Sequence, residues 1–233
     1  MKTITKKQEV APVEAFKNWP LAWLRLRRSV IAGLVVSLGL VFPGAPFAGA
    51  QKPTPAIRVR VDNYTQVSPG TLAGAEREAA RILDAAGLRT VWLDCPKGHS
   101  PAVTKDPCQD PLGPSDIELR LVFESAQSKF QDTVFGFAVH PILATVYYDY
   151  PVRLARGDNA DFELPIILGC VIAHELGHLL LGSNSHSGSG IMQPRWERKQ
   201  VRQAMTGALL FTSAQAKRIQ SEAESRIRVQ TAS

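Results

Sequence analysis

One segment of the sequence limits the fold more than any other. Residues 165–181 are almost wholly apolar, and the side chains that stand out from this pattern are His174, Glu175 and His178. The run is too long for a strand, so it predicts a helix that is buried in the protein. Because ionisable side chains are costly to bury without partners, we expect these three residues to have a function.

The other segments predict what packs around this helix. Apolar runs, several of them alternating with polar residues, predict five strands at residues 57–61, 90–93, 117–123, 134–139 and 144–148. Apolar residues at helical spacing predict one helix at residues 71–86 and a last one from near Thr212 or Ser213 to about residue 228. The expected fold is α/β, with helices packed against a mixed, twisted sheet of about five strands.

The first fifty residues differ in composition from the rest. They contain seven Lys and Arg and two Glu, and residues 29–42 form an uncharged stretch that follows all of these charges. Ala-Gly-Ala at residues 48–50 provides a small-x-small cleavage site. We therefore predict a signal peptide at residues 1–50 and a domain at residues 51–233.

The leader also predicts where the protein is located. Its uncharged stretch is too short to cross a bilayer, so no stable membrane anchor is expected once the leader is cleaved. The domain should be exported and become secreted or periplasmic. Arg27 and Arg28 allow the twin-arginine route as well as the general secretory route.

The charge of the remaining domain argues against nucleic acid as a partner. Residues 51–233 carry 20 Lys and Arg against 19 Asp and Glu, whereas nucleic-acid binding calls for an excess of clustered cations facing phosphates. We therefore expect no nucleic-acid partner, and we expect a monomer.

The sequence His174-Glu175-Leu-Gly-His178 has the pattern of a helical metal site. Two histidines four positions apart lie about 40° apart around a helix axis, so both can give a nitrogen to one Zn²⁺. Glu175 lies beside the metal, where a carboxylate can take a proton from water and pass it to a leaving amine. His186 is the candidate for the third ligand, because Gly182 can end the helix and a short loop can bring the chain back.

Residues 174–194 resemble the metzincin zinc endopeptidases, especially the matrixin-like group. The HExxH motif is followed by a glycine, a third histidine and Ser189-Gly-Ile-Met192-Gln-Pro194, with Met192 lying 18 residues after the first histidine. The resemblance implies a zincin-like α+β fold with an antiparallel edge strand, for which residues 136–140 are the candidate. It also implies that His174, His178 and His186 are the zinc ligands. Glu175 would be the general base, and Met192 would be the Met-turn methionine.

The spacing departs from the family pattern. In metzincins the glycine and the third histidine follow the second histidine by three and six positions. Here Gly182 and His186 follow His178 by four and eight positions, and Asn184 occupies the usual place of the third ligand.

We therefore expect an exported zinc-dependent endopeptidase. One alternative is a non-catalytic zinc-binding module, although a structural site would not need Glu175 as a base. The other is a peptidase of the glutamate-zincin type, whose third ligand is a later residue such as Glu197 or Glu222. Substituting His186 separates the glutamate-zincin alternative from the expected three-histidine site, because zinc affinity should be lost only if His186 is a ligand.

The chain has three cysteines. Cys95 and Cys108 flank a loop rich in proline and glycine, and in an exported protein they can form a disulfide, the alternative being two unpaired thiols. Cys170 lies in the apolar helical run and is expected to be a small buried side chain.

Overall fold

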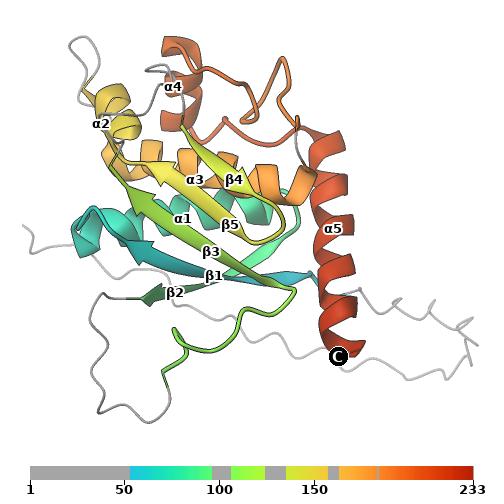
Figure 1. Ribbon diagram of the computed structural model, residues 1–233. Coiled ribbons are helices and arrows are strands. Elements are labelled where there is room, and N and C mark those ends of the chain that lie inside the picture. Colours follow the sequence, from blue (N-terminus) through green and yellow to red (C-terminus); the bar gives the residue numbers. More distant parts are fainter. Residues whose placement is uncertain (1–52, 96–105, 124–134, 157–162, 183, 233) are drawn as a thin grey trace, which may run out of the picture. The chain divides into compact units, whose positions relative to one another are not determined.

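The computed structural model describes residues 53–95, 106–123, 135–156, 163–182 and 184–232. The described residues form a twisted sheet with two long helices on one face and a third long helix beside one end (Figure 1). The leader expected at residues 1–50 lies outside the described residues, so its extent and the domain boundary that follows it stay predictions.

Within the described part of the chain, five strands form the sheet in the order β2-β1-β3-β5-β4. Pairing is parallel from β2 through β5, and β4 pairs antiparallel with β5 at the edge. The expected mixed sheet of five strands with an antiparallel edge strand is therefore confirmed. The bounds of the strands are β1 Ala56–Asn63, β2 Arg89–Cys95, β3 Asp116–Val122, β4 Gly136–Val139 and β5 Leu143–Tyr147.

Among the described residues, three long helices accompany the sheet: α1 (Pro69–Ala85), α3 (Leu164–Leu181) and α5 (Ser213–Ala232). α1 and α3 lie side by side on one face, while α5 stands beside the sheet (Figure 1). All three agree with the helices expected from the sequence. Two short helices, α2 (Asp149–Ala155) and α4 (Arg198–Met205), are additions that the periodicity did not predict.

Glycines allow α1 and α3 to approach closely. A Cβ on Gly169 of α3 would lie 2.6 Å from the backbone oxygen of Ala75 and from Cβ of Glu78, both in α1. A Cβ on Gly74 of α1 would lie 2.7 Å from Cβ of Pro165. A glycine in each helix therefore leaves room for atoms of the other helix to approach closely.

Burial of α3 agrees with the expectation of a core helix. Among the described helices it is the one that is long and apolar enough to cross a membrane, but 78% of it is buried inside the protein. Residues 170–177 of this helix are all buried. The apolar sequence is thus explained by packing against the sheet and α1, and the histidines of α3 are held on a rigid element.

A buried arginine donates hydrogen bonds at the C-terminal end of α3. Arg226 of α5 is 6% exposed, and its two terminal nitrogens donate to the carbonyl oxygens of Leu179 and Pro141, each at 2.9 Å. Its Nε donates to Glu222 at 2.9 Å. Leu179 belongs to the last turn of α3, whose carbonyls lack partners within the helix, and Pro141 lies in the turn between β4 and β5. One side chain therefore joins three elements.

The cysteines take the positions expected from the sequence. Cys95, the last residue of β2, forms a disulfide with Cys108. Most of the loop that this bond closes lies outside the described residues. Cys170 is buried in α3 as a free thiol, and burial raises its pKa far above the ordinary value, so it is a packing residue.

Candidate metal centre

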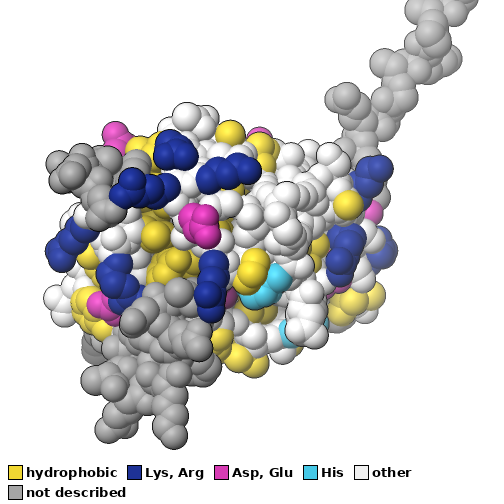
Figure 2. All heavy atoms as spheres, turned by 90° about the horizontal axis from the view of Figure 1, so that it is seen from above, with side chains coloured by type: hydrophobic (Ala, Val, Ile, Leu, Met, Phe, Trp, Pro, Cys, Tyr) yellow, Lys and Arg dark blue, Asp and Glu magenta, His cyan; other side chains and the backbone are white. Residues whose placement is uncertain are grey.

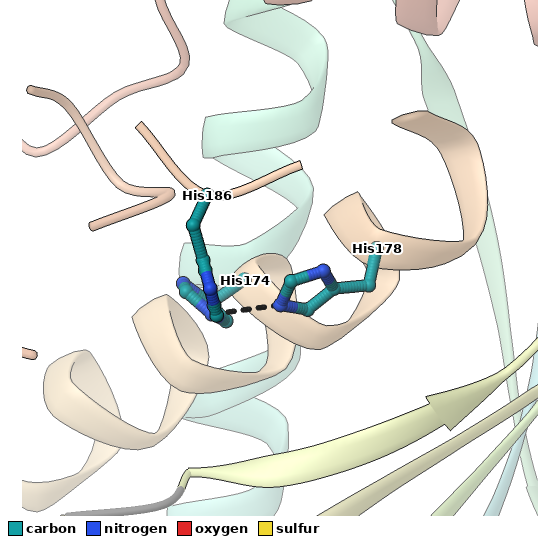
Figure 3. A group of neighbouring side chains, drawn as sticks. All are labelled: His174, His178 and His186. Atoms are coloured by element: carbon teal, nitrogen blue, oxygen red, sulfur yellow. Dashed lines mark hydrogen bonds between the residues drawn. The ribbon is translucent and has the colours of Figure 1, made fainter. Parts of the chain in front are cut away.

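Three histidines converge next to α3. His174 and His178 lie one turn apart on the helix, and His186 reaches them from the loop that follows (Figure 3). One nitrogen from each ring can be chosen so that all three lie within 4.8 Å of one another, and Nε2 of His174 is 3.1 Å from Nε2 of His178. Nitrogen ligands of a tetrahedral zinc lie about 3.3 Å apart, so the histidine pair already has a suitable separation.

Two residues with positive φ return the chain to the metal centre. Gly182 ends α3 with φ 86°, and its N–H donates to the carbonyl of His178 at 3.1 Å. Asn184 follows with φ 60°, a conformation that asparagine tolerates better than most residues. Asn184 is exposed, and its positive φ makes it part of the turn. His186, two residues later, lies with the other two histidines.

Hydrogen bonds orient the two helix histidines. Nδ1 of His174 lies 2.8 Å from the carbonyl oxygen of Ile191, which can only accept, so this nitrogen carries the proton and Nε2 keeps its lone pair. Nδ1 of His178 lies 2.9 Å from the hydroxyl of Ser185. The Ile191 oxygen also accepts from Nε1 of Trp196 at 3.3 Å. Ser185, Ile191 and Trp196 thus support the ligands, and neither the motif nor its spacing points to them.

All three histidines are kept neutral in the metal-free protein. Burial lowers the pKa of His174 to about 3 and that of His178 to about 4. Burial also lowers the pKa of the more exposed His186. Because a metal binds the unprotonated nitrogen, the fold holds the three rings in the state that a cation requires.

Glu175 is buried without a full set of partners. It is 2% exposed, and burial raises the pKa of its carboxyl to about 8. Its Oε2 atom has no hydrogen-bond partner among the described residues. Glu175 follows the ligand candidate His174 on the same buried turn of α3. A buried carboxyl with an unsatisfied oxygen fits a site completed by a cation and water, since a nearby positive charge favours the ionised form. The donor set therefore fits zinc.

Met192 packs against the helix between its two histidines. The side chain is fully buried, and a Cβ on Gly177 would lie 2.6 Å from its Sδ. The turn that carries Met192 is held by two backbone hydrogen bonds, from Ser187 N to Met192 O and from Ile191 N to Leu210 O, both 2.9 Å long. Met192 and the Ile191 carbonyl are therefore positioned by the same turn.

An aromatic cluster lies on one side of His174. The ring of Phe135 is 4.6 Å from that of His174, 4.7 Å from that of Tyr150 and 4.6 Å from that of Trp196, measured between centroids. The hydroxyl of Tyr150 is hydrogen-bonded by the backbone of Trp196. Tyr150 is therefore a packing residue that supports the histidine.

Neither alternative glutamate lies with the histidines. The carboxylate of Glu197 accepts from a backbone N–H in the first turn of α4, in a capping box with Gln200. Glu222 pairs with Arg226 at 2.9 Å. Among the described residues, the group that can hold a metal consists of His174, His178 and His186 alone.

The sequence matches no protein-family model and no curated protein. Two solved structures are similar in fold. Archaemetzincin from Methanopyrus kandleri has a TM-score of 0.47 and 15% identity, and the match covers 72% of this chain and 96% of that one. A zinc-dependent peptidase from Methanocorpusculum labreanum has a TM-score of 0.45 and 16% identity, with coverage of 70% and 99%.

Proposed function

We propose that this chain is a zinc-dependent metallopeptidase, and more narrowly an endopeptidase of the matrixin-like kind. The observation that carries the proposal is the convergence of three histidines, whose ligand nitrogens lie within 4.8 Å of one another, at a helix that also carries the buried Glu175. His174, His178 and His186 would hold the zinc. A purely structural zinc site has four protein ligands, whereas a catalytic one has three, and three is the number of ligands that the described residues supply.

Zinc bound there would lower the pKa of a water molecule and polarise the carbonyl of a peptide bond. Glu175 is the residue that can move the proton. Its carboxylate would accept a proton from water at Oε2, the oxygen that lacks a partner, and then pass it to the leaving amine. Burial raises the pKa of this carboxyl in the metal-free protein, and the positive charge of a bound zinc would favour the ionised form that the first step needs.

The edge strand β4 supports peptide as the substrate. β4 is the last strand in the order of the sheet and pairs with β5 on one side. An extended peptide can add to such an edge through main-chain hydrogen bonds. Phe135, the residue before β4, contacts the ligand His174, so a peptide bound along this edge would pass beside the metal centre. We propose Met192 as the Met-turn residue below it.

We also propose that the protein is exported after cleavage at residue 50 and acts as a monomer in the periplasm or outside the cell. The disulfide between Cys95 and Cys108 supports this location, because disulfides persist in oxidising compartments. The same location implies that the substrates are exported or extracellular proteins.

Cleavage of a diverse peptide library by zinc-loaded residues 51–233, compared with the Glu175→Ala variant, tests the function. The proposal requires cleavage at internal peptide bonds by the first protein and its loss in the second. Tight binding of one zinc by both proteins without any cleavage would refute it and would favour the non-catalytic zinc module.

A further inference from the structure

The two edge strands of the sheet differ in how they are protected. An edge strand presents unpaired backbone groups, and proteins usually protect it with charge, with proline or with a covering segment. β2, at one edge, carries the exposed charges of Arg89 and Asp94. β4, at the other edge, has the sequence Gly-Phe-Ala-Val and contains neither a charge nor a proline. β4 therefore has the composition of an edge strand that can accept another strand.

The backbone of β4 faces β5 and the open edge at alternate residues. The N–H of Tyr147 in β5 donates to the carbonyl of Phe135 at 2.9 Å. In an antiparallel pair such hydrogen-bonded positions recur at every second residue, so the register places Phe137 and Val139 at bonded positions as well. The N–H and C=O of Ala138, which lies between them, therefore point to the open edge, where a further strand would pair with them.

The side chains of β4 add apolar surface beside that edge. Phe137 is 44% exposed and Val139 is 52% exposed, whereas Ala138 packs against the core. The centroid of the Phe137 ring lies 6.1 Å from that of Tyr147 in β5, so the phenyl ring lies against the sheet. An extended peptide at this edge would gain main-chain hydrogen bonds from the backbone and side-chain contacts from these two residues.

This edge begins at the metal centre. Phe135 directly precedes β4, and its ring centroid is 4.6 Å from that of His174. From this contact β4 runs on to Val139. Figure 2 shows histidine side chains at the surface with hydrophobic side chains next to them. A peptide that pairs antiparallel with β4 would run towards the metal centre, so its residues opposite Val139 and Phe137 would precede the peptide bond that reaches the metal.

We propose that β4 makes this enzyme select extended peptides in which two apolar residues, separated by one residue, lie on the N-terminal side of the scissile bond. The inference rests on the proposed peptidase function. Ala138 is the hydrogen-bonded position at the open edge, so Phe137 and Val139 would form non-hydrogen-bonded pairs with the peptide. Side chains in such pairs are closest, with Cα atoms about 4.5 Å apart.

The chemistry of the two exposed side chains defines the peptide. Aromatic and β-branched side chains pair favourably across strands, so Val, Ile, Phe and Tyr are the residues expected opposite Phe137 and Val139. The peptide residue between them points to the other face of the added strand and is not selected by this pair.

A peptide fits this edge better than a second copy of the chain does. β4 has four residues, so two copies paired along it would form few hydrogen bonds. A stable interface between proteins buries at least about 1,200 Å², which so short a strand does not provide. A substrate is held at the metal centre as well and needs less from the edge.

The test uses the purified, zinc-loaded full chain and fluorogenic peptides with one cleavable bond. An Ile-Ala-Ile segment, or a matched Asn-Ala-Asn segment, is placed at successive distances before that bond, and mass spectrometry confirms the bond that is cut. At the best distance we expect kcat/KM for the Ile peptide to exceed that for the Asn peptide by about tenfold, the effect of two favourable cross-strand pairs. Equal cleavage of the two peptides at every distance would overturn the inference.

Matched variants locate the selectivity. Phe137→Thr keeps a residue that favours strands but removes the ring, and it should lower the ratio between the Ile and Asn peptides severalfold. Val91→Thr changes an apolar residue of β2 that is 49% exposed and should leave that ratio as it is. An unchanged ratio in a Phe137→Thr protein with wild-type zinc affinity would overturn the inference.

A proline tests the backbone of the edge. Ala138→Pro removes the N–H that points to the open edge and keeps the hydrogen bonds of Phe137 and Val139 to β5. It should lower kcat/KM for both peptides by about tenfold, while zinc affinity and cooperative unfolding stay as in the wild type. Full activity of this variant would overturn the pairing of the substrate with β4.

A binding measurement separates this inference from the peptidase proposal. Fluorescence anisotropy of the labelled peptides with the Glu175→Gln variant reports selection without cleavage. If the wild type cleaves nothing, the peptidase proposal fails, but tighter binding of the Ile peptide than of the Asn peptide, lost on adding Phe137→Thr, still supports docking at β4. Equal binding of the two peptides would overturn it. A wild-type dimer in sedimentation that Ala138→Pro dissociates would assign the edge to a second copy and would also overturn the inference.

Discussion

Replacing Gly177 by alanine tests whether Met192 supports the metal helix. A Cβ at this position would lie 2.6 Å from Sδ of Met192 and 2.8 Å from Cε1 of Phe211, about 1 Å closer than a favourable carbon contact. Such overpacking costs about 1–3 kcal/mol, and the better helix propensity of alanine returns about 1 kcal/mol. The net loss of unfolding free energy should therefore be about 0–2 kcal/mol.

The same substitution should weaken zinc binding. The turn that carries Met192 also carries the Ile191 carbonyl, which orients His174 at 2.8 Å. Displacing Met192 should disturb that hydrogen bond and reduce zinc affinity by about tenfold, the size of effect seen when a group supporting a zinc ligand is changed.

Urea unfolding of the metal-free protein measures the first effect, and zinc competition with a chromophoric chelator measures the second. Gly70→Ala is the matched control, because Gly70 is also in a helix but a Cβ there would meet nothing within 4 Å. It should be neutral or stabilise by up to about 1 kcal/mol. If Gly177→Ala behaved in the same way and kept full zinc affinity, the supporting role of Met192 would be refuted.

Three further predictions concern His186, the buried Arg226 and Glu175. His186→Ala should reduce zinc affinity by more than about 100-fold in chelator competition, whereas Asn184→Gly, at a positive φ, should leave it nearly unchanged; similar affinities in both would exclude His186 as a ligand. Arg226→Met should cost about 2–4 kcal/mol of unfolding free energy because it leaves buried carbonyls unpaired, while Arg228→Met, at a largely exposed residue, should change it by less than about 0.5 kcal/mol. As the pH rises from about 4.5 to 8, the metal-free protein should lose stability that a Glu175→Gln variant keeps. The reason is that the folded carboxyl holds its proton up to about pH 8, while the unfolded one ionises near 4.5. Urea unfolding of both proteins across this pH range measures the difference, and parallel pH profiles would contradict the prediction.

The sequence is most informative where one pattern serves both the fold and the site. The apolar run around His174 predicts a buried helix, and its two histidines predict a shared face. The edge strand β4 can be predicted as well, because a short apolar run follows β3 and precedes the inner strand β5. In each case the signal is local, and the physical reason is burial of a periodic apolar surface.

What the sequence does not predict depends on contacts between distant residues. α2 and α4 are too short for a clear period, and α4 is set by the capping box of Glu197 and Gln200. The carbonyl of Ile191 has no sequence signature, because any residue provides a carbonyl. Phe135 and Arg226 read as ordinary strand and helix residues, and their roles follow from elements that meet only in the folded chain.

The turn built by Gly182 and Asn184 has a consequence for finding related chains. A search pattern that fixes the third histidine six positions after the second would pass over this protein. What geometry demands is that the chain reverse direction after the helix, and two residues at positive φ accomplish this over a longer loop. Genomic searches should therefore allow the gap to vary and require instead a glycine at the helix end followed by an asparagine or glycine before the last histidine.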